Sequence, residues 1–118
     1  MSSNVKTPWY AHSDGVPLHL EYPDCSMADL VIKAAQQRPD IIAYDFFGVK
    51  ATFRQMVEEI KLCAAALRAM GIEPGDKVTI CMPNTPQAVV MFYAINYMGA
   101  IANMVHPLSG QEEIAFYL

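Results

Sequence analysis

The sequence predicts an α/β fold in which a β-hairpin and a βαβ unit with parallel strands are flanked by helices. Two observations indicate this class. Residues 77–105 alternate an apolar strand, an apolar helix and a second strand across short connections, and strands joined through a helix pair in parallel. Earlier, the apolar and aromatic run 41–47 is followed by Gly48 and another short run, which is typical of a hairpin.

Residues 1–25 are predicted to form an irregular N-terminal arm, because three prolines and scattered aromatic residues interrupt any periodic pattern. The first helix begins after Ser26. Its hydroxyl and the carboxylate of Asp29 can each accept a hydrogen bond from a backbone amide that the first turn leaves free. Arg38, Pro39 and Asp40 end this helix.

A second capping pair, Thr52 and Gln55, starts a longer helix. Its apolar side chains recur at helical spacing and predict one buried face. Gly71 is placed to end the helix in a left-handed conformation. The predicted face consists of Phe53, Met56, Val57, Ile60, Ala64 and Leu67.

The βαβ unit begins with a strand predicted over 77–82. Asn84 is a capping residue and Pro86 suits the first helical position, so a helix is expected over 86–98. Gly99 ends it, and a strand over 100–105 follows.

The apolar surface of helix 86–98 goes nearly all the way round, since only Gln87 and Asn96 are clearly polar. Such a helix is normally covered on every side, and a chain of this length can cover one face. We therefore expect residues 26–118 to be an incomplete α/β subdomain. The alternative is that helix 86–98 pairs two copies of the chain, since exposed apolar patches mark interfaces.

The pattern at the end of the sequence also predicts an incomplete subdomain. Ser109 and Glu112 form a third potential capping box, which opens a helix. That helix reaches only Leu118 and contains no Gly, Asn or Pro that would stop it. The pattern predicts the first half of an amphipathic helix that continues.

The composition is that of a folded chain, with 53% hydrophobic and 17% charged residues. The net charge is -4, and the eight Lys and Arg residues are scattered. This excludes nucleic acid as a partner, because a phosphate backbone selects for clustered cations. The apolar stretch 88–98 is too short to span a bilayer, and the N-terminus has no apolar signal segment. We therefore expect a cytoplasmic protein.

Three cysteines, Cys25, Cys63 and Cys81, have spacings that fit neither a metal clip nor an even-numbered disulfide framework. Cys63 falls on a helix pattern and Cys81 on a strand pattern. We expect buried free thiols in a reducing compartment.

Two polar residues follow the predicted parallel strands, Asn84 after the first and His106 after the second. Ligands in open α/β sheets bind outside the carboxyl ends of the strands. Asn84 and His106 are therefore candidate substrate-binding residues lining a shared crevice. The alternative is structural, with Asn84 capping the helix and His106 bonding to nearby backbone. The sequence contains no glycine-rich phosphate loop, so no catalytic, cofactor-binding or metal-ligating residue is assigned.

Six short motifs occur in a fixed order along residues 52–114. They are TFRQM at 52–56, GIEPGDKV at 71–78, MPNTPQAVV at 82–90, AINYMGA at 94–100, HPL at 106–108 and EEI at 112–114. In order and spacing they resemble the early part of adenylate-forming enzymes, the AMP-binding superfamily. The nearest likeness is to the N-terminal segment of bacterial acyl-CoA synthetases of the fatty-acid type. The resemblance covers about residues 26–118 and implies a partial N-terminal subdomain of such an enzyme.

The resemblance implies a two-step ligase. A carboxylate attacks ATP to give an acyl-adenylate and pyrophosphate, and the thiol of CoA then displaces AMP. ATP, Mg²⁺ and CoA are the cofactors of the family, and a carboxylic acid is its substrate. The phosphate loop and the catalytic Lys of the family come later in the chain, so the resemblance transfers no catalytic residue. We expect residues 1–118 alone to be inactive, to bind none of the cofactors, and to have the remainder of the chain as their partner.

Two other functions are left open. The chain could be a self-standing interaction module that dimerises through helix 86–98. It could also begin an amino-acid-activating adenylation domain, which differs from an acyl-CoA synthetase in its substrate.

Overall fold

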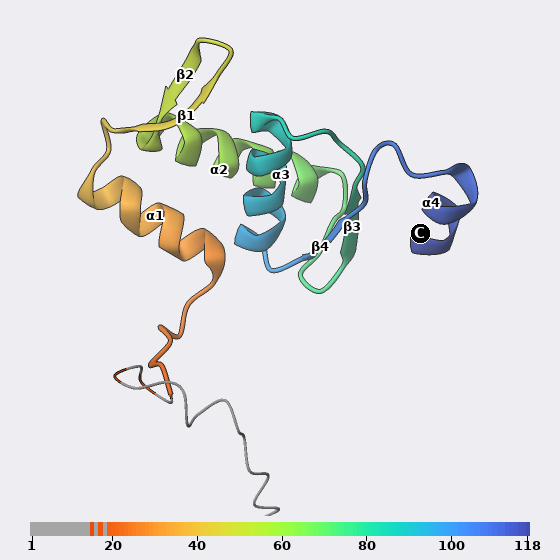
Figure 1. The fold of residues 1–118 in the computed structure, drawn as a ribbon, viewed down its shortest axis with the longest axis horizontal. Helices are drawn as coiled ribbons and strands as arrows, with labels where there is room; N and C mark the ends of the chain where they lie inside the picture. Colours follow the sequence, from red (N-terminus) through yellow and green to blue (C-terminus); the bar gives the residue numbers. More distant parts are fainter. Residues whose placement is uncertain (1–14, 16, 18) are drawn as a thin grey trace, which may run out of the picture.

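The computed structural model describes Gly15, Pro17 and residues 19–118, so most of the predicted arm 1–25 lies outside the described residues (Figure 1). The fold class is α/β, as predicted. The elements are α1 (Met27–Gln37), β1 (Ile42–Phe46), β2 (Val49–Thr52), α2 (Phe53–Ala69), β3 (Lys77–Ile80), α3 (Pro86–Tyr97), β4 (Ile101–Met104) and α4 (Gln111–Tyr117).

The strands form two separate pairs within the described part of the chain. β1 and β2 are antiparallel, and β3 and β4 are parallel neighbours joined through α3. The hairpin turn consists of Phe47 and Gly48, both with positive φ, at 50° and 88°. Asp45 supports this turn, because its Oδ1 accepts a hydrogen bond of 3.0 Å from the amide of Gly48.

Two predicted capping boxes are present. Ser26 Oγ accepts a bond of 3.1 Å from the amide of Asp29, and Asp29 Oδ2 accepts one of 2.9 Å from the amide of Ser26. The hydrogen bonds from the hydroxyl and amide of Ser26 hold the pKa of the Asp29 carboxyl below its usual value. Thr52 and Gln55 exchange the same two bonds at the start of α2.

The predicted start of α3 at Pro86 is confirmed but its predicted cap is wrong, and α4 starts later than predicted. Thr85 caps α3, because its hydroxyl accepts the amide of Ala88 at 3.4 Å, so Asn84 lies one residue before the cap. The third capping box does not form. Gly110 is the N-cap of α4 and makes no side-chain cap bond, because the helix begins one residue later than the Ser109 pattern predicts.

The parallel strands are shorter than predicted, because their register ends where Ile80 pairs with Met104. Cys81 lies beyond this register and is exposed, as is Cys25, whereas Cys63 is half-buried. All three thiols are free. The expectation of buried thiols is therefore wrong for Cys25 and Cys81 and only partly met by Cys63.

The core forms where α3 packs on α2. Helix α3 lies at the centre of the fold and also contacts α1, β3 and β4 (Figure 1). The predicted face of α2 is buried except for Phe53, which is half-buried. The buried cluster consists of Val31, Met56, Val57, Ile60, Ala64, Leu67, Ile80, Ala94, Ile95, Met98 and Ala100.

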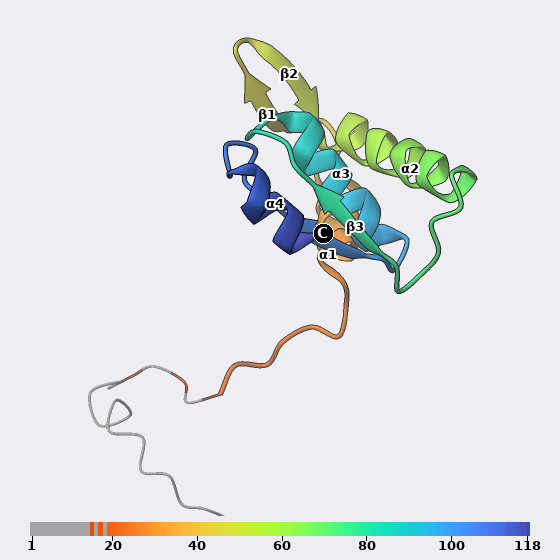
Figure 2. The ribbon, with the colours of Figure 1, turned by 90° about the vertical axis from the view of Figure 1, so that its right-hand side faces the viewer.

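The two faces of the β3–β4 pair carry different helices. α3 covers one face, where Val78, Ile80 and Ala102 pack in or against the core. α4 lies on the opposite side of the strands (Figures 1 and 2). Asn103 holds it there, because its Nδ2 donates to the carbonyl of Tyr117 at 2.9 Å. Among the described residues, no helix is long and apolar enough to cross a membrane.

Asn96 connects α3 to α1. Its Oδ1 accepts a hydrogen bond of 2.9 Å from the amide of Ala28, across 68 positions of sequence. Ala28 lies in the first turn of α1, where amides have no partner within the helix. The side-chain amide of Asn96, in the last turn of an apolar helix, therefore supplies an acceptor to the start of another helix.

We expect Asn96→Ala to lower the free energy of unfolding by about 1–3 kcal/mol, because the nearly buried amide of Ala28 loses its acceptor. Urea unfolding measures the loss, and hydrogen exchange should become faster at the amide of Ala28. Gln87→Ala, at an exposed position of the same helix, is the control. Equal stabilities for the two variants would contradict a structural role for the Asn96–Ala28 bond.

Candidate functional site

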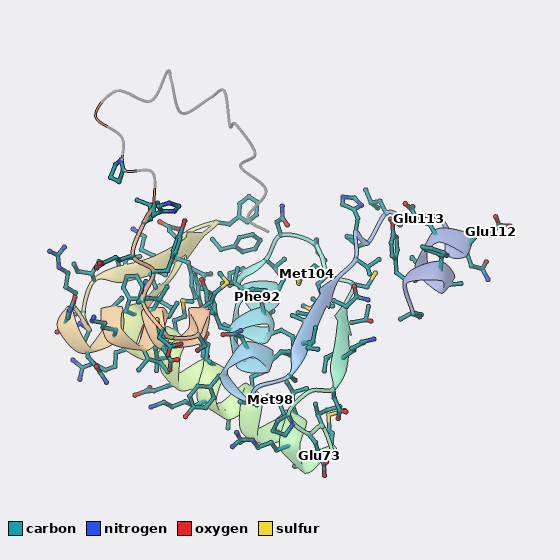
Figure 3. All side chains as sticks on the ribbon, turned by 90° about the horizontal axis from the view of Figure 1, so that it is seen from below. Glu73, Phe92, Met98, Met104, Glu112 and Glu113 are labelled. Carbon is teal, nitrogen blue, oxygen red and sulfur yellow. The ribbon has the colours of Figure 1, made fainter. Side chains whose placement is uncertain are left out.

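An apolar groove of about 710 Å³ lies between the hairpin and the N-terminal half of α3. Phe92 of α3 and Met104 at the end of β4 both line it and lie near one another in Figure 3. Its volume is within the range of small-molecule sites. The full lining is Val31, Ala43, Tyr44, Asp45, Phe46, Phe53, Met56, Asn84, Thr85, Pro86, Ala88, Val89, Phe92, Tyr93 and Met104.

Tyr44 is one of the polar groups that line the groove, and its hydroxyl has a defined partner. Its hydroxyl donates to Glu59 Oε2 of α2 at 3.3 Å. Loss of solvent around the ring raises the pKa of Tyr44, and the negative charge of Glu59 adds to this effect. The phenol therefore stays protonated and acts as a hydrogen-bond donor.

Asn84 lies on the wall of the groove, in the connection between β3 and α3. Its side chain is exposed. Because Thr85 caps α3, the Asn84 amide is not used for capping. The structural alternative for Asn84, that it caps the helix, is therefore wrong.

His106 is placed differently. It follows β4, is exposed, and does not line the groove. Its Nδ1 accepts a hydrogen bond of 3.1 Å from the amide of Leu108, which assigns the proton of a neutral imidazole to Nε2. This contact is the local backbone bond expected as the alternative for His106. The groove thus brings Asn84 together with Tyr44 and not with His106.

The groove does not fit the phosphates of ATP or CoA. Phosphate groups bind to cations or to clustered backbone amides. The lining contains no Lys or Arg, and its one ionised side chain, Asp45, is negative and pairs with Lys50 at 3.3 Å. Within the described ranges, no three His, Cys, Asp or Glu side chains gather closely enough to hold a metal ion.

A sulfur pair that the sequence pattern did not indicate lies between α2 and α3. Cys63 Sγ and Met91 Sδ are 3.7 Å apart. They line a second hollow with Tyr44 and Glu59. Burial raises the pKa of the Cys63 thiol, which lowers the fraction of reactive thiolate. Its contact with Met91 is one of packing between the two helices.

Comparisons with known proteins agree on one family. A family model described as AMP-binding enzyme matches residues 31–118. A long-chain-fatty-acid–CoA ligase of Bacillus subtilis is 30% identical over 112 residues, which are 94% of this chain and 20% of that protein. The chain therefore spans about a fifth of the length of this curated relative.

Two solved proteins have the same fold. A fatty acyl CoA synthetase of Mycobacterium tuberculosis matches with a TM-score of 0.74 at 29% identity, over 77% of this chain and 18% of that one. The N-terminal subdomain of Klebsiella oxytoca NpsA, in complex with anthranilyl-AMSN, matches with a TM-score of 0.76 at 27% identity, over 79% of this chain and 24% of that one. NpsA fused artificially to ThdA, an adenylation-PCP di-domain, matches with a TM-score of 0.78 at 27% identity, over 82% of this chain and 18% of that one.

We expect Cys63 to react with iodoacetamide more slowly than the exposed Cys25 and Cys81. A thiol reacts as its thiolate. With a raised pKa, the alkylation rate of Cys63 should therefore increase only at a higher pH. The midpoint for Cys63 should lie above the ordinary thiol value of about 8.5. Peptide mass spectrometry after timed alkylation between pH 6 and about 10 measures each site. A midpoint for Cys63 below the ordinary value would contradict its burial against Met91.

Proposed function

Because the chain belongs to the AMP-binding enzyme family, we propose that it is part of an ATP-dependent acyl-CoA synthetase. The family and the fold class, part of an N-terminal subdomain of an adenylate-forming enzyme, are as predicted. The proposed reaction joins a carboxylate to AMP with release of pyrophosphate and then transfers the acyl group to CoA. The observation that carries this proposal is the similarity to a long-chain-fatty-acid–CoA ligase over 94% of this chain.

Within such an enzyme, residues 26–118 would act as scaffold. The lining of the groove offers no cation for a phosphate, so ATP, Mg²⁺ and CoA would be held by other parts of the enzyme. The remainder of the chain would be the main partner of this segment and would cover the apolar groove. Val89 and Tyr97 of α3 remain 43% and 39% exposed. Exposed apolar side chains of this kind mark contact surfaces, which supports contact with the remainder of the chain. We also propose a cytoplasmic location.

The substrate class has one supported alternative. NpsA is an adenylation domain, and its fold matches this chain as well as that of the fatty acyl CoA synthetase does. An amino-acid-type or aryl carboxylate could therefore replace the fatty acid. Self-association through α3 is the second alternative, supported by the same exposed residues.

Asn84 and His106 remain proposed substrate-binding residues. The connection that carries Asn84 leaves β3 toward the face covered by α3, and the one that carries His106 leaves β4 toward the face that holds α4. Adjacent connections that diverge to opposite faces open a crevice at the carboxyl ends of the strands, where ligands of α/β sheets bind. If both residues bind the substrate, the ligand must reach from Asn84 on the groove wall to His106 in the connection after β4.

We expect residues 1–118 alone to show no carboxylate-dependent ATP–pyrophosphate exchange, because the segment supplies no phosphate site. The full-length enzyme should show exchange with long-chain fatty acids and then form acyl-CoA. Exchange with an amino acid or aryl acid and no fatty acid would favour the adenylation-domain alternative. Exchange by residues 1–118 alone would overturn the scaffold role, and a stable dimer of this segment in sedimentation would support self-association.

We expect Asn84→Ala and His106→Ala in the full-length enzyme each to lower kcat/KM for the carboxylate by about tenfold, the loss of roughly one hydrogen bond. Steady-state kinetics measure the change, and thermal unfolding checks that the fold is intact. Gln111→Ala, at an exposed position of α4, is the control. Activities equal to that of the control would remove both residues from the site.

A further inference from the structure

Helices α2 and α3 pack on each other, and each presents two metal-binding types of side chain to the second hollow between them (Figure 1). Glu59 and Cys63 are four positions apart on α2, and Gln87 and Met91 are four positions apart on α3. Side chains at this spacing share one face of a helix. The hollow, of about 420 Å³, therefore gathers two sulfur atoms, a carboxylate and a side-chain amide from two facing helices.

The two sulfur atoms are close enough to bind one ion. Cys63 Sγ and Met91 Sδ are 3.7 Å apart, and both side chains are half-buried. At the metal–sulfur distance of about 2.3 Å found in thiolate sites, an ion that contacts both atoms across this separation makes an angle of about 107° between its two bonds. This angle is close to the tetrahedral value. The contact that packs α2 on α3 thus also has the geometry of two ligands to one ion.

The surroundings of the sulfur pair suit a cation. Glu59 supplies a negative charge, and its Oε2 accepts a hydrogen bond of 3.3 Å from the hydroxyl of Tyr44, which also lines the hollow. A hydrogen bond that fixes a carboxylate in this way is common in the outer layer of metal sites. The described lining contains no Lys or Arg that would repel a cation.

The types of ligand select the kind of ion. Thiolate and thioether sulfur atoms are soft ligands, which favour Cu(I). Structural Zn²⁺ sites use four Cys or His ligands, whereas the described lining offers Cys63 and no His. Mg²⁺ and Ca²⁺ prefer several oxygen ligands, and Glu59 is the one carboxylate of this lining. Cu(I) is therefore the ion that these side chains fit.

We propose that Cys63 and Met91 bind a Cu(I) ion through their sulfur atoms, beside the carboxylate of Glu59. The S–H bond of Cys63 breaks, its proton passes to solvent, and the sulfur forms a bond to copper. Met91 donates a lone pair of its thioether. Copper stays in the +1 state, so binding needs no oxidant or reductant. The site goes beyond the proposed synthetase activity and does not depend on it.

The alternative role of the sulfur pair is packing alone. Met fills irregular gaps in a core, and a free Cys behaves there as a small apolar residue. Leu replaces Met in a core at little cost because the two have similar volumes, but Leu has no lone pair for a metal. Met91→Leu therefore keeps the packing role and removes the ligand.

Copper binding by the full-length enzyme tests the site. The parent protein carries Cys25→Ser and Cys81→Ser, which removes the other two thiols of residues 1–118. Cu(I) is supplied without oxygen as the complex of a coloured chelator, and its transfer to the protein is measured by the loss of colour. Cys63→Ser and Met91→Leu are compared with the parent. Met70→Leu, at a side chain that is 77% exposed at the end of α2, is the matched control.

We expect the parent to bind one more Cu(I) ion than Cys63→Ser does. Met91→Leu should raise the Kd of this ion at least about tenfold, and Met70→Leu should leave it unchanged. Equal affinities of Met91→Leu and Met70→Leu, or equal binding by the parent and Cys63→Ser, would overturn the proposal. An excess of Mg²⁺ should displace no copper, and displacement would also contradict a site of soft ligands.

A second measurement uses the parent and does not require the variants to fold. Cu(I) is diamagnetic, so the methyl groups of ¹³C-labelled methionine remain visible by NMR when it binds. The methyl resonance of Met91 should shift with Cu(I), and that of Met70 should not. An unshifted Met91 resonance would overturn the proposal. Both measurements are made without ATP or a carboxylate, so their results are independent of ATP–pyrophosphate exchange.

Discussion

Helix α3 has almost no polar face, and the rest of the structure is arranged to cover it. α2 packs along one side with Ile60 and Ala64, and the parallel strands cover another. Burial of apolar surface contributes about 25 cal/mol per Å², so a helix of this kind gains most when every side is occupied. Asn96, a polar side chain in its last turn, also contributes by bonding to the start of α1. Both the core and the position of α1 therefore depend on one helix.

The same helix explains the character of the candidate site. Its N-terminal half forms one wall of the groove with Val89 and Phe92, and the hairpin forms the other. The groove is apolar because its lining continues the surface of the core, to which Val31 and Met56 belong. Few polar side chains line it: Tyr44, which bonds to Glu59, with Asp45, Asn84 and Thr85. The Bacillus subtilis relative, of which this chain covers 20%, is about five times as long as this chain.

Local signals in the sequence predicted what local forces decide. The capping boxes at Ser26 and Thr52 formed because their partners lie three residues away in any helix that begins there. The buried face of α2 was predicted from the helical spacing of its apolar residues. Ser109 fulfilled the same pattern and was wrong, because the helix starts one residue later, with Gly110 as its N-cap. Cys81 was expected in a strand, but a strand extends only as far as its partner, and the register ends at Met104.

The sequence alone determined the fold class, the order of the elements, the family resemblance and the nearly all-round apolar surface of helix 86–98. These properties follow from residue order and from periods of a few residues. Only the tertiary structure decided that Asn96 bonds to Ala28, that Tyr44 and Asn84 share a groove without His106, and that α4 lies opposite α3. Each of these joins side chains or segments that the packing of helices and strands brings together, and the spacing of residues along the chain does not specify that packing.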